Sequence, residues 1–263
     1  MNKDFVKNIM VIIPVHEYND KVSDMLYEAI KSIPSDISVL ISASEDAYKS
    51  IVDSPIEKRV TVANGEKDKS SFSELVNNGV KNLPQEVKYF SILEFDDQYN
   101  ANWFMNIEKY SEFNPEVSVF MPIEEIFNFN DKKFVGYGNE APWASSFSEE
   151  IGFIDNASLQ DYADYYLTGS VFNKEDWNLL GGLKESIKLS FWYEFLLRCM
   201  HNKKKVMVIP KTGYKHYINR EKSLYNIYSE TMSQDESLWW FKLAKTECKY
   251  KEDRKKVYKK PEN

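Results

Sequence analysis

Three carboxylates follow one apolar segment of the chain and could bind a cation. The segment 89–93 is apolar and predicts a buried strand. Glu94, Asp96 and Asp97 come directly after it. Carboxylates are rarely buried without partners, so three of them at the end of a strand need a physical reason. A divalent cation held by oxygen ligands is one reason, and an acidic turn in contact with solvent is the alternative.

Strands and helices alternate along the first half of the chain. Short apolar runs predict strands at 9–13, 37–41, 60–62, 89–93, 117–121 and 206–209. Apolar residues at helical spacing predict helices near 22–33, 72–83 and 103–110, and Ser190 is the predicted N-cap of a helix over 191–200. This order is typical of an α/β fold with a mostly parallel central sheet, in which ligands bind beyond the carboxyl ends of the strands.

The composition excludes several classes of protein. The chain has 263 residues, of which 43% are hydrophobic and 15% aromatic, so it can bury a large core and is not expected to be disordered. Cys199 and Cys248 lie far apart, which argues against a disulfide framework and against a cysteine zinc site. The segment 1–10 is too polar for a secretory signal, and no apolar run reaches the length of a membrane span. The predicted location is therefore cytoplasmic.

Basic residues gather in the last third of an acidic chain. The formal net charge is −7, yet the segment 203–222 holds seven Lys and Arg against one Glu, and the segment 242–263 holds nine against four acidic residues. This distribution fits either a Lys-rich surface exposed to solvent or a patch for a polyanion such as nucleic acid or a membrane surface.

Six segments, in sequence order, resemble the motifs of GT-A fold glycosyltransferases, in particular the large family-2-like group. They are the strand and turn 11–19, the helix 71–80 with Asn77 and Gly79, the acidic motif 94–96, the turn after Gly181-Gly182, the helix 193–198, and His216, Arg220 and Ser223 near the end. The resemblance covers roughly residues 9–223. It implies a Rossmann-like nucleotide-diphospho-sugar transferase fold and the transfer of a sugar from a nucleotide-diphosphate sugar to an acceptor hydroxyl, with inversion.

The resemblance also implies a metal site for Mn²⁺ or Mg²⁺. Asp96 is the predicted direct ligand and His216 the residue that completes the site. Asp97 is predicted either to support the direct ligands from behind or to bind the ion through water. Carboxylate oxygens suit both cations, and Mn²⁺ also accepts imidazole. Arg220 is predicted to pair with the diphosphate oxygens, and Glu94 to bind the ribose hydroxyls.

Donor binding is predicted at a further group of positions, and the donor expected is a UDP-sugar. The positions are Pro14, Tyr18, Ser42, Ser44, Asp46, Asn77 and Ser223. One of them departs from the family, because Ser42 stands where the family has an aspartate that contacts the base. The identity of the nucleotide is therefore less secure than the presence of a donor site.

Inverting transfer needs a general base that takes the proton of the acceptor hydroxyl. In the family this is the aspartate of a Glu-Asp pair, and Phe191 and Trp192 replace that pair here. Glu194 is the nearest carboxylate and the predicted base, with Asp176 in reserve. Alternatively, Glu194 only complements the dipole of the helix N-terminus.

Three regions follow from this interpretation. Residues 1–122 form the nucleotide-sugar-binding half of one GT-A domain, 123–228 the acceptor-binding half, and 229–263 a basic helical tail. The aromatic segment 124–163 fits either loops that line a binding surface or a small extra sheet. The predicted acceptor is hydroxymethylated DNA of the kind that phage enzymes modify. A cell-surface glycan or its lipid-linked precursor is the alternative, and a non-catalytic nucleotide-sugar or nucleic-acid binding module is the alternative of another class.

Overall fold

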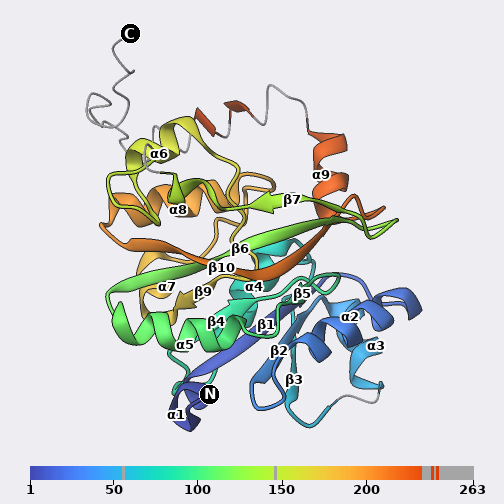
Figure 1. Ribbon diagram of the computed structural model, residues 1–263. Helices are drawn as coiled ribbons and strands as arrows, with labels where there is room; N and C mark the ends of the chain where they lie inside the picture. Colours follow the sequence, from blue (N-terminus) through green and yellow to red (C-terminus); the bar gives the residue numbers. More distant parts are fainter. Residues whose placement is uncertain (55–56, 145–146, 233–237, 240, 243–263) are drawn as a thin grey trace.

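A computed structural model describes residues 1–54, 57–144, 147–232, 238–239 and 241–242. In this part of the chain the strands form one curled sheet in the order β3-β2-β1-β4-β9-β6-β10-β5, with β7 paired to β6 and β8 paired to β10 (Figure 1). Most of the predicted basic tail, from residue 233 onward, lies outside the described residues.

The longest ladders of the sheet are parallel, as the alternating pattern predicts. They join β3 (Val60–Asn64), β2 (Ser38–Ala43), β1 (Ile9–Val15) and β4 (Tyr89–Ile92), and separately β6 (Val117–Asn128) and β10 (Lys205–Ile218). The short strands β5 (Gln98–Tyr99), β7 (Phe134–Gly138), β8 (Phe153–Ile154) and β9 (Val171–Asn173) pair in antiparallel fashion. The α/β fold with a mostly parallel sheet is therefore confirmed.

Alternate residues of β1 belong to two separate hydrophobic clusters, one on each face of the sheet. Met10 and Ile12 pack in one cluster, whereas Val11 and Ile13 pack in the other. Because both faces are covered, the strand carries an unbroken apolar run instead of an alternating one.

Helices α4 (Phe72–Lys81), α7 (Lys174–Leu180) and α8 (Phe191–His201) supply the first cluster, and α2 (Asp20–Ser32), α3 (Glu45–Val52) and α5 (Trp103–Phe113) supply the second. The remaining elements are α1 (Lys3–Asn8), η1 (Ala141–Trp143), α6 (Asn156–Asp161) and α9 (Leu224–Thr231).

Local capping signals explain where two of the helices start. The side chain of Asn19 accepts hydrogen bonds from Lys21 N and Val22 N at the start of α2, and Ser71 forms a capping box with Glu74 at the start of α4. Ser190 occupies the N-cap position of α8 as predicted, but its hydroxyl makes no capping hydrogen bond.

Two strands are much longer than their apolar runs indicate. β6 continues to Asn128 and β10 to Ile218, so the region after residue 121 is an extension of the sheet and His216 lies within a strand. β7 pairs with this extension, which resolves the first part of the aromatic segment 124–163 as additional sheet. The predicted boundary at 122 thus falls inside β6. None of the described helices is long and apolar enough to cross a bilayer.

Gly79 of α4 is expected to be required for close packing of this helix on the sheet. A Cβ atom at this position would lie 2.6 Å from Ile12 Cγ2 and 3.3 Å from Ser42 Cβ. Gly79→Ala is therefore expected to lower the free energy of unfolding by about 1–3 kcal/mol, although alanine is the better helix former. Chemical denaturation measures the change. Gly136→Ala in β7 is the control, because nothing lies within 4 Å of its added Cβ, and an equal loss in both variants would contradict the packing argument.

Candidate active site

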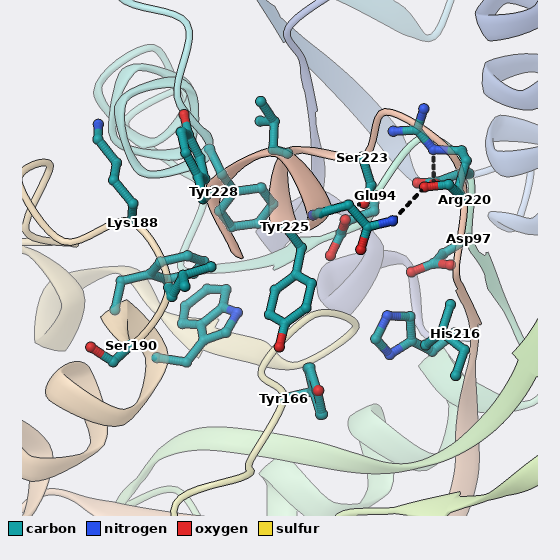
Figure 2. Close-up of a pocket in the computed structure, with 18 of the residues that line it drawn as sticks. Glu94, Asp97, Tyr166, Lys188, Ser190, His216, Arg220, Ser223, Tyr225 and Tyr228 are labelled. Carbon is teal, nitrogen blue, oxygen red and sulfur yellow. Dashed lines mark hydrogen bonds and ion pairs between the residues drawn. The ribbon is translucent and has the colours of Figure 1, made fainter. Parts of the chain in front are cut away.

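A cavity of ≈ 440 Å³ opens beyond the carboxyl ends of β1 and β4 (Figure 2). One end of this cavity is polar and carries charges, and the other end is largely aromatic. The polar end includes Pro14, His16, Glu94, Asp96, Asp97, His216, Arg220 and Ser223, and the aromatic end includes Tyr166, Lys188, Ser190, Phe191, Trp192, Tyr225 and Tyr228. The structure therefore brings the predicted metal ligands, which are 120 residues apart in the chain, into one cavity at the edge of the sheet where ligands of such folds bind.

Arg220 forms an internal ion pair at the polar end. Its Nε donates to Asp96 Oδ2 at 2.5 Å, and another of its nitrogens lies 3.5 Å from Glu17 Oε1. The guanidinium also stands over the ring of Phe95, 4.9 Å from its centroid. Arg220, the predicted partner of the diphosphate, and Asp96, the predicted metal ligand, thus form an ion pair with each other.

Asp97 and His216 lie deeper in the same end. Asp97 Oδ1 accepts a hydrogen bond from Tyr217 N at 2.7 Å, whereas Asp97 Oδ2 is buried and meets no donor among the described residues. Burial raises the pKa of Asp97 well above its usual range. Burial alone would lower the pKa of His216, but the nearby carboxylates of Asp97 and Glu124 outweigh it and raise that pKa to about 10.

Glu94 is the third carboxylate of the polar end and is half-buried. Burial, with the adjacent charge of Asp96, raises the pKa of Glu94 to about 7. Its backbone N donates to Tyr214 Oη at 3.2 Å, which fixes the turn after β4 on β10. Glu94 can therefore gain or lose a proton near neutral pH.

Five of the predicted donor-binding residues do not line the cavity. Ser42 is buried and accepts from Asn78 Nδ2 at 3.0 Å, and Ser44 caps α3 and donates to His16 O at 2.9 Å. Asp46 is exposed on α3, with Lys49 3.6 Å away. These contacts support the local structure of the strand ends around the cavity.

Tyr18 and Asn77 are the other two predicted donor-binding residues that do not line the cavity. Tyr18 Oη lies within hydrogen-bond distance of the hydroxyls of Ser23 and Ser54. Asn77 donates to Leu183 O at 2.8 Å and accepts from Leu183 N at 2.9 Å, so it holds the turn between α7 and α8. Pro14 and Ser223, in contrast, do line the cavity, and the binding roles of all these residues stay predictions.

Neither predicted base lines the cavity. Glu194 is only 1% exposed, and Arg198 donates to its two oxygens at 2.6 and 2.7 Å. Lys184 Nζ also lies 3.3 Å from Glu194 Oε1. Asp176 accepts from Ser118 Oγ at 2.5 Å and pairs with Lys204, on the side of the sheet that carries α7. The structure places both carboxylates in ion pairs within the protein, outside the cavity.

Asp164, which the sequence motifs do not predict, lines the cavity from the loop between α6 and β9. Apart from residues 94–97, it is the one carboxylate among the described lining residues. Asn139, whose φ is 66°, holds this loop: its side chain donates to Tyr166 O at 2.8 Å and accepts from Tyr166 N at 3.2 Å. No periodic pattern surrounds Asp164, so only the fold could reveal it.

The fold is similar to that of solved structures of S. aureus TarS, although no family model and no curated protein match the sequence. S. aureus TarS 1–349 matches with a TM-score of 0.58 and 15% identity over 80% of this chain and 60% of that chain. TarS 1–349 in complex with UDP-GlcNAc matches with a TM-score of 0.67 and 14% identity over 94% of this chain and 68% of that chain. The match also covers 37% of the chain in a longer TarS structure. This protein therefore spans less than two thirds of the TarS chain in that structure and in the first TarS 1–349 structure. The likeness establishes the fold, and the chain therefore has the GT-A-type glycosyltransferase fold that its motifs predict.

Proposed function

We propose that this protein is a metal-dependent, inverting glycosyltransferase that moves a sugar from a UDP-sugar to an acceptor hydroxyl. The observation that carries the proposal is the joining of Asp96, Asp97 and His216 in one cavity beyond β1 and β4. Support for the donor comes from the fold, because TarS, which shares it, has been crystallised with UDP-GlcNAc and with UDP.

The chemistry of the polar end fits a divalent cation. Asp97 Oδ2 is an orphaned buried oxygen, and carboxylates with an imidazole form a donor set that suits Mn²⁺. Among the described residues, no three His, Cys, Asp or Glu side chains converge closely enough to hold a metal ion as they stand. Asp96 and Asp97 would hold the ion with His216, and Asp96 would have to share or leave Arg220. A bound cation neutralises the charge that grows on the leaving diphosphate.

The general base in this proposal is Asp164. Glu94, Asp96 and Asp97 share one turn at the polar end, whereas Asp164 reaches the cavity from a separate loop next to the aromatic end. An exposed carboxylate in that place can accept the proton of an acceptor hydroxyl while the donor occupies the polar end. In this proposal Asp164 takes the role of the aspartate in the family's Glu-Asp pair, which Phe191 and Trp192 replace in this chain.

The acceptor in this proposal is DNA that carries hydroxymethylated cytosine. Aromatic side chains such as Tyr225 and Tyr228 offer rings on which a flipped base can stack. The basic residues of segment 203–222 add attraction for a polyanion, although Lys204 and Lys205 already pair with Asp176 and Glu116.

The test is a donor screen with Mn²⁺ that follows nucleotide release in the presence of different acceptors. We expect release from a UDP-sugar with hydroxymethylated DNA and not with unmodified DNA of the same sequence. Removal of the metal with EDTA should lower the rate by roughly 100-fold, since the charge stabilisation by the cation is worth several kcal/mol. The rate with DNA should also fall steeply as salt rises.

Three results would count against parts of this function. Equal rates with and without EDTA would contradict metal dependence. Salt-insensitive release that only neutral oligosaccharides stimulate would replace DNA by a glycan. Binding of UDP-sugars without release under all conditions would make the protein a non-catalytic binding module.

A further inference from the structure

Glu124 is a fully buried carboxylate behind the polar end of the cavity. It lies on β6 and is 0% exposed. Neither of its oxygens has a hydrogen-bond donor among the described residues, and His216 Nδ1, which also has none, lies 3.5 Å from Glu124 Oε2. Removal of a carboxylate from water costs several kcal/mol, so this position needs a compensating function.

The register of the sheet brings Glu124 and His216 to the same face. β6 and β10 are parallel neighbours in which Tyr214 is paired with Glu124 and His216 with Ile126. Paired residues, and residues two apart along a strand, share a face, so the two side chains meet across the ladder. β7 leaves room for the carboxylate, because the residue opposite Glu124 is Gly138, where a Cβ atom would lie 3.2 Å from Glu124 Oε2.

The ring of His216 is also restrained by its other neighbours. Tyr166 meets it in a T-shaped contact at 5.1 Å between ring centroids, and Asn139 holds the backbone of Tyr166. Figure 2 shows His216 close to Asp97 and Tyr166 at the cavity wall. With Nδ1 toward Glu124, the opposite ring nitrogen, Nε2, is directed away from the carboxylate.

We infer that Glu124 is a positioning residue that accepts Nδ1–H of His216 and thereby presents Nε2 of the ring to the cavity. The value of this arrangement rests on the proposed function, in which His216 contributes to the metal and diphosphate site. A carboxylate that accepts from the far nitrogen fixes the ring and makes the near nitrogen a better ligand. The approach of Nδ1 to within 3.5 Å of Glu124 Oε2 is present without donor or metal.

The first test is a proton–nitrogen NMR spectrum of the full-length protein labelled in its histidines. The chain has 3 histidines, and loss of one signal in His216→Gln assigns it. We expect a downfield, slowly exchanging Nδ1–H signal from His216 in the unmodified protein. Glu124→Gln should move it upfield, and Glu124→Ala should abolish it through exchange with water.

Glu125→Gln is the matched control, because Glu125 is the next residue of β6 and instead accepts from Asn100 Nδ2 at 2.7 Å. Its His216 signal should be unchanged. A slowly exchanging signal that survives in Glu124→Ala would overturn the inference. The absence of a slowly exchanging signal from the unmodified protein would also overturn the inference, and this result does not depend on whether a variant folds.

The second test measures the rate of sugar transfer and the affinity for Mn²⁺. Glu124→Gln is expected to lower Mn²⁺ affinity or kcat by about 10–100-fold, and Glu125→Gln should leave both unchanged. If neither metal nor donor binds the unmodified protein, the proposed function fails while the NMR test still decides the role of Glu124. Unchanged Mn²⁺ affinity and kcat in Glu124→Gln, in an otherwise active protein, would contradict the inference.

Discussion

Asp164→Asn is expected to lower kcat by about 10²–10⁴-fold, because an amide cannot take the proton of the acceptor hydroxyl. The donor should bind as tightly as before, since Asp164 lies in a loop separate from the acidic turn 94–97. Initial rates of UDP release and a direct titration of UDP-sugar measure the two quantities. The folded state should also be unaffected, because the side chain is exposed at the cavity.

Asp131→Asn is the control for this variant. Asp131 is an exposed aspartate in the turn between β6 and β7 and does not line the cavity, so the same change there should leave kcat unaltered. A kcat of Asp164→Asn close to that of the control would rule out Asp164 as the base. A parallel loss of donor affinity would instead assign Asp164 to donor binding.

Glu194→Gln is expected to lower the free energy of unfolding by about 3–5 kcal/mol, because it breaks a buried ion pair and leaves Arg198 with an uncompensated charge. Arg198 also donates to Leu180 O and Gly182 O, so its displacement disturbs the turn between α7 and α8 as well. Urea denaturation at neutral pH measures the loss. Glu175→Gln, on the exposed side of α7, should stay within about 0.5 kcal/mol of the unmodified protein.

The same variant decides the role predicted for Glu194 from the motif. A base that faces the acceptor can be replaced by glutamine with little loss of stability and a large loss of kcat. A buried structural carboxylate shows the reverse pattern. Full stability combined with loss of turnover would restore Glu194 as the base and contradict its placement in the ion pair.

The sequence predicts the central strands well because burial on both faces leaves a strong signal. The runs 9–13 and 89–93 each become a strand within a few residues of the expected limits. The extensions of β6 and β10 are not predictable in this way, because half-buried strands beyond residue 121 mix charged, aromatic and apolar side chains. Their length comes from pairing with each other, which is a property of the fold.

The site is only partly predictable for a similar reason. Motif order predicts the site residues 94–97 and His216, and the fold places them in one cavity. The surroundings of Glu194 depend on which side of α8 it occupies, and the ion pair with Arg198 is known only from the structure. Asp164 and Glu124 carry no local pattern at all, and only tertiary contacts distinguish them from other acids.

The side chain of Asn77 substitutes for a peptide unit between α4 and the turn that follows α7. Its amide both donates to and accepts from the backbone of one residue, Leu183, as a neighbouring strand would. Two simultaneous bonds fix the direction of the turn as well as its distance, and a Cβ atom at Gly182 would collide with Asn77 Oδ1 at 2.6 Å. Helix α4, which follows strand β3, and the turn that leads into α8 are therefore held at a fixed distance and direction, and we expect them to move as one unit when a ligand binds.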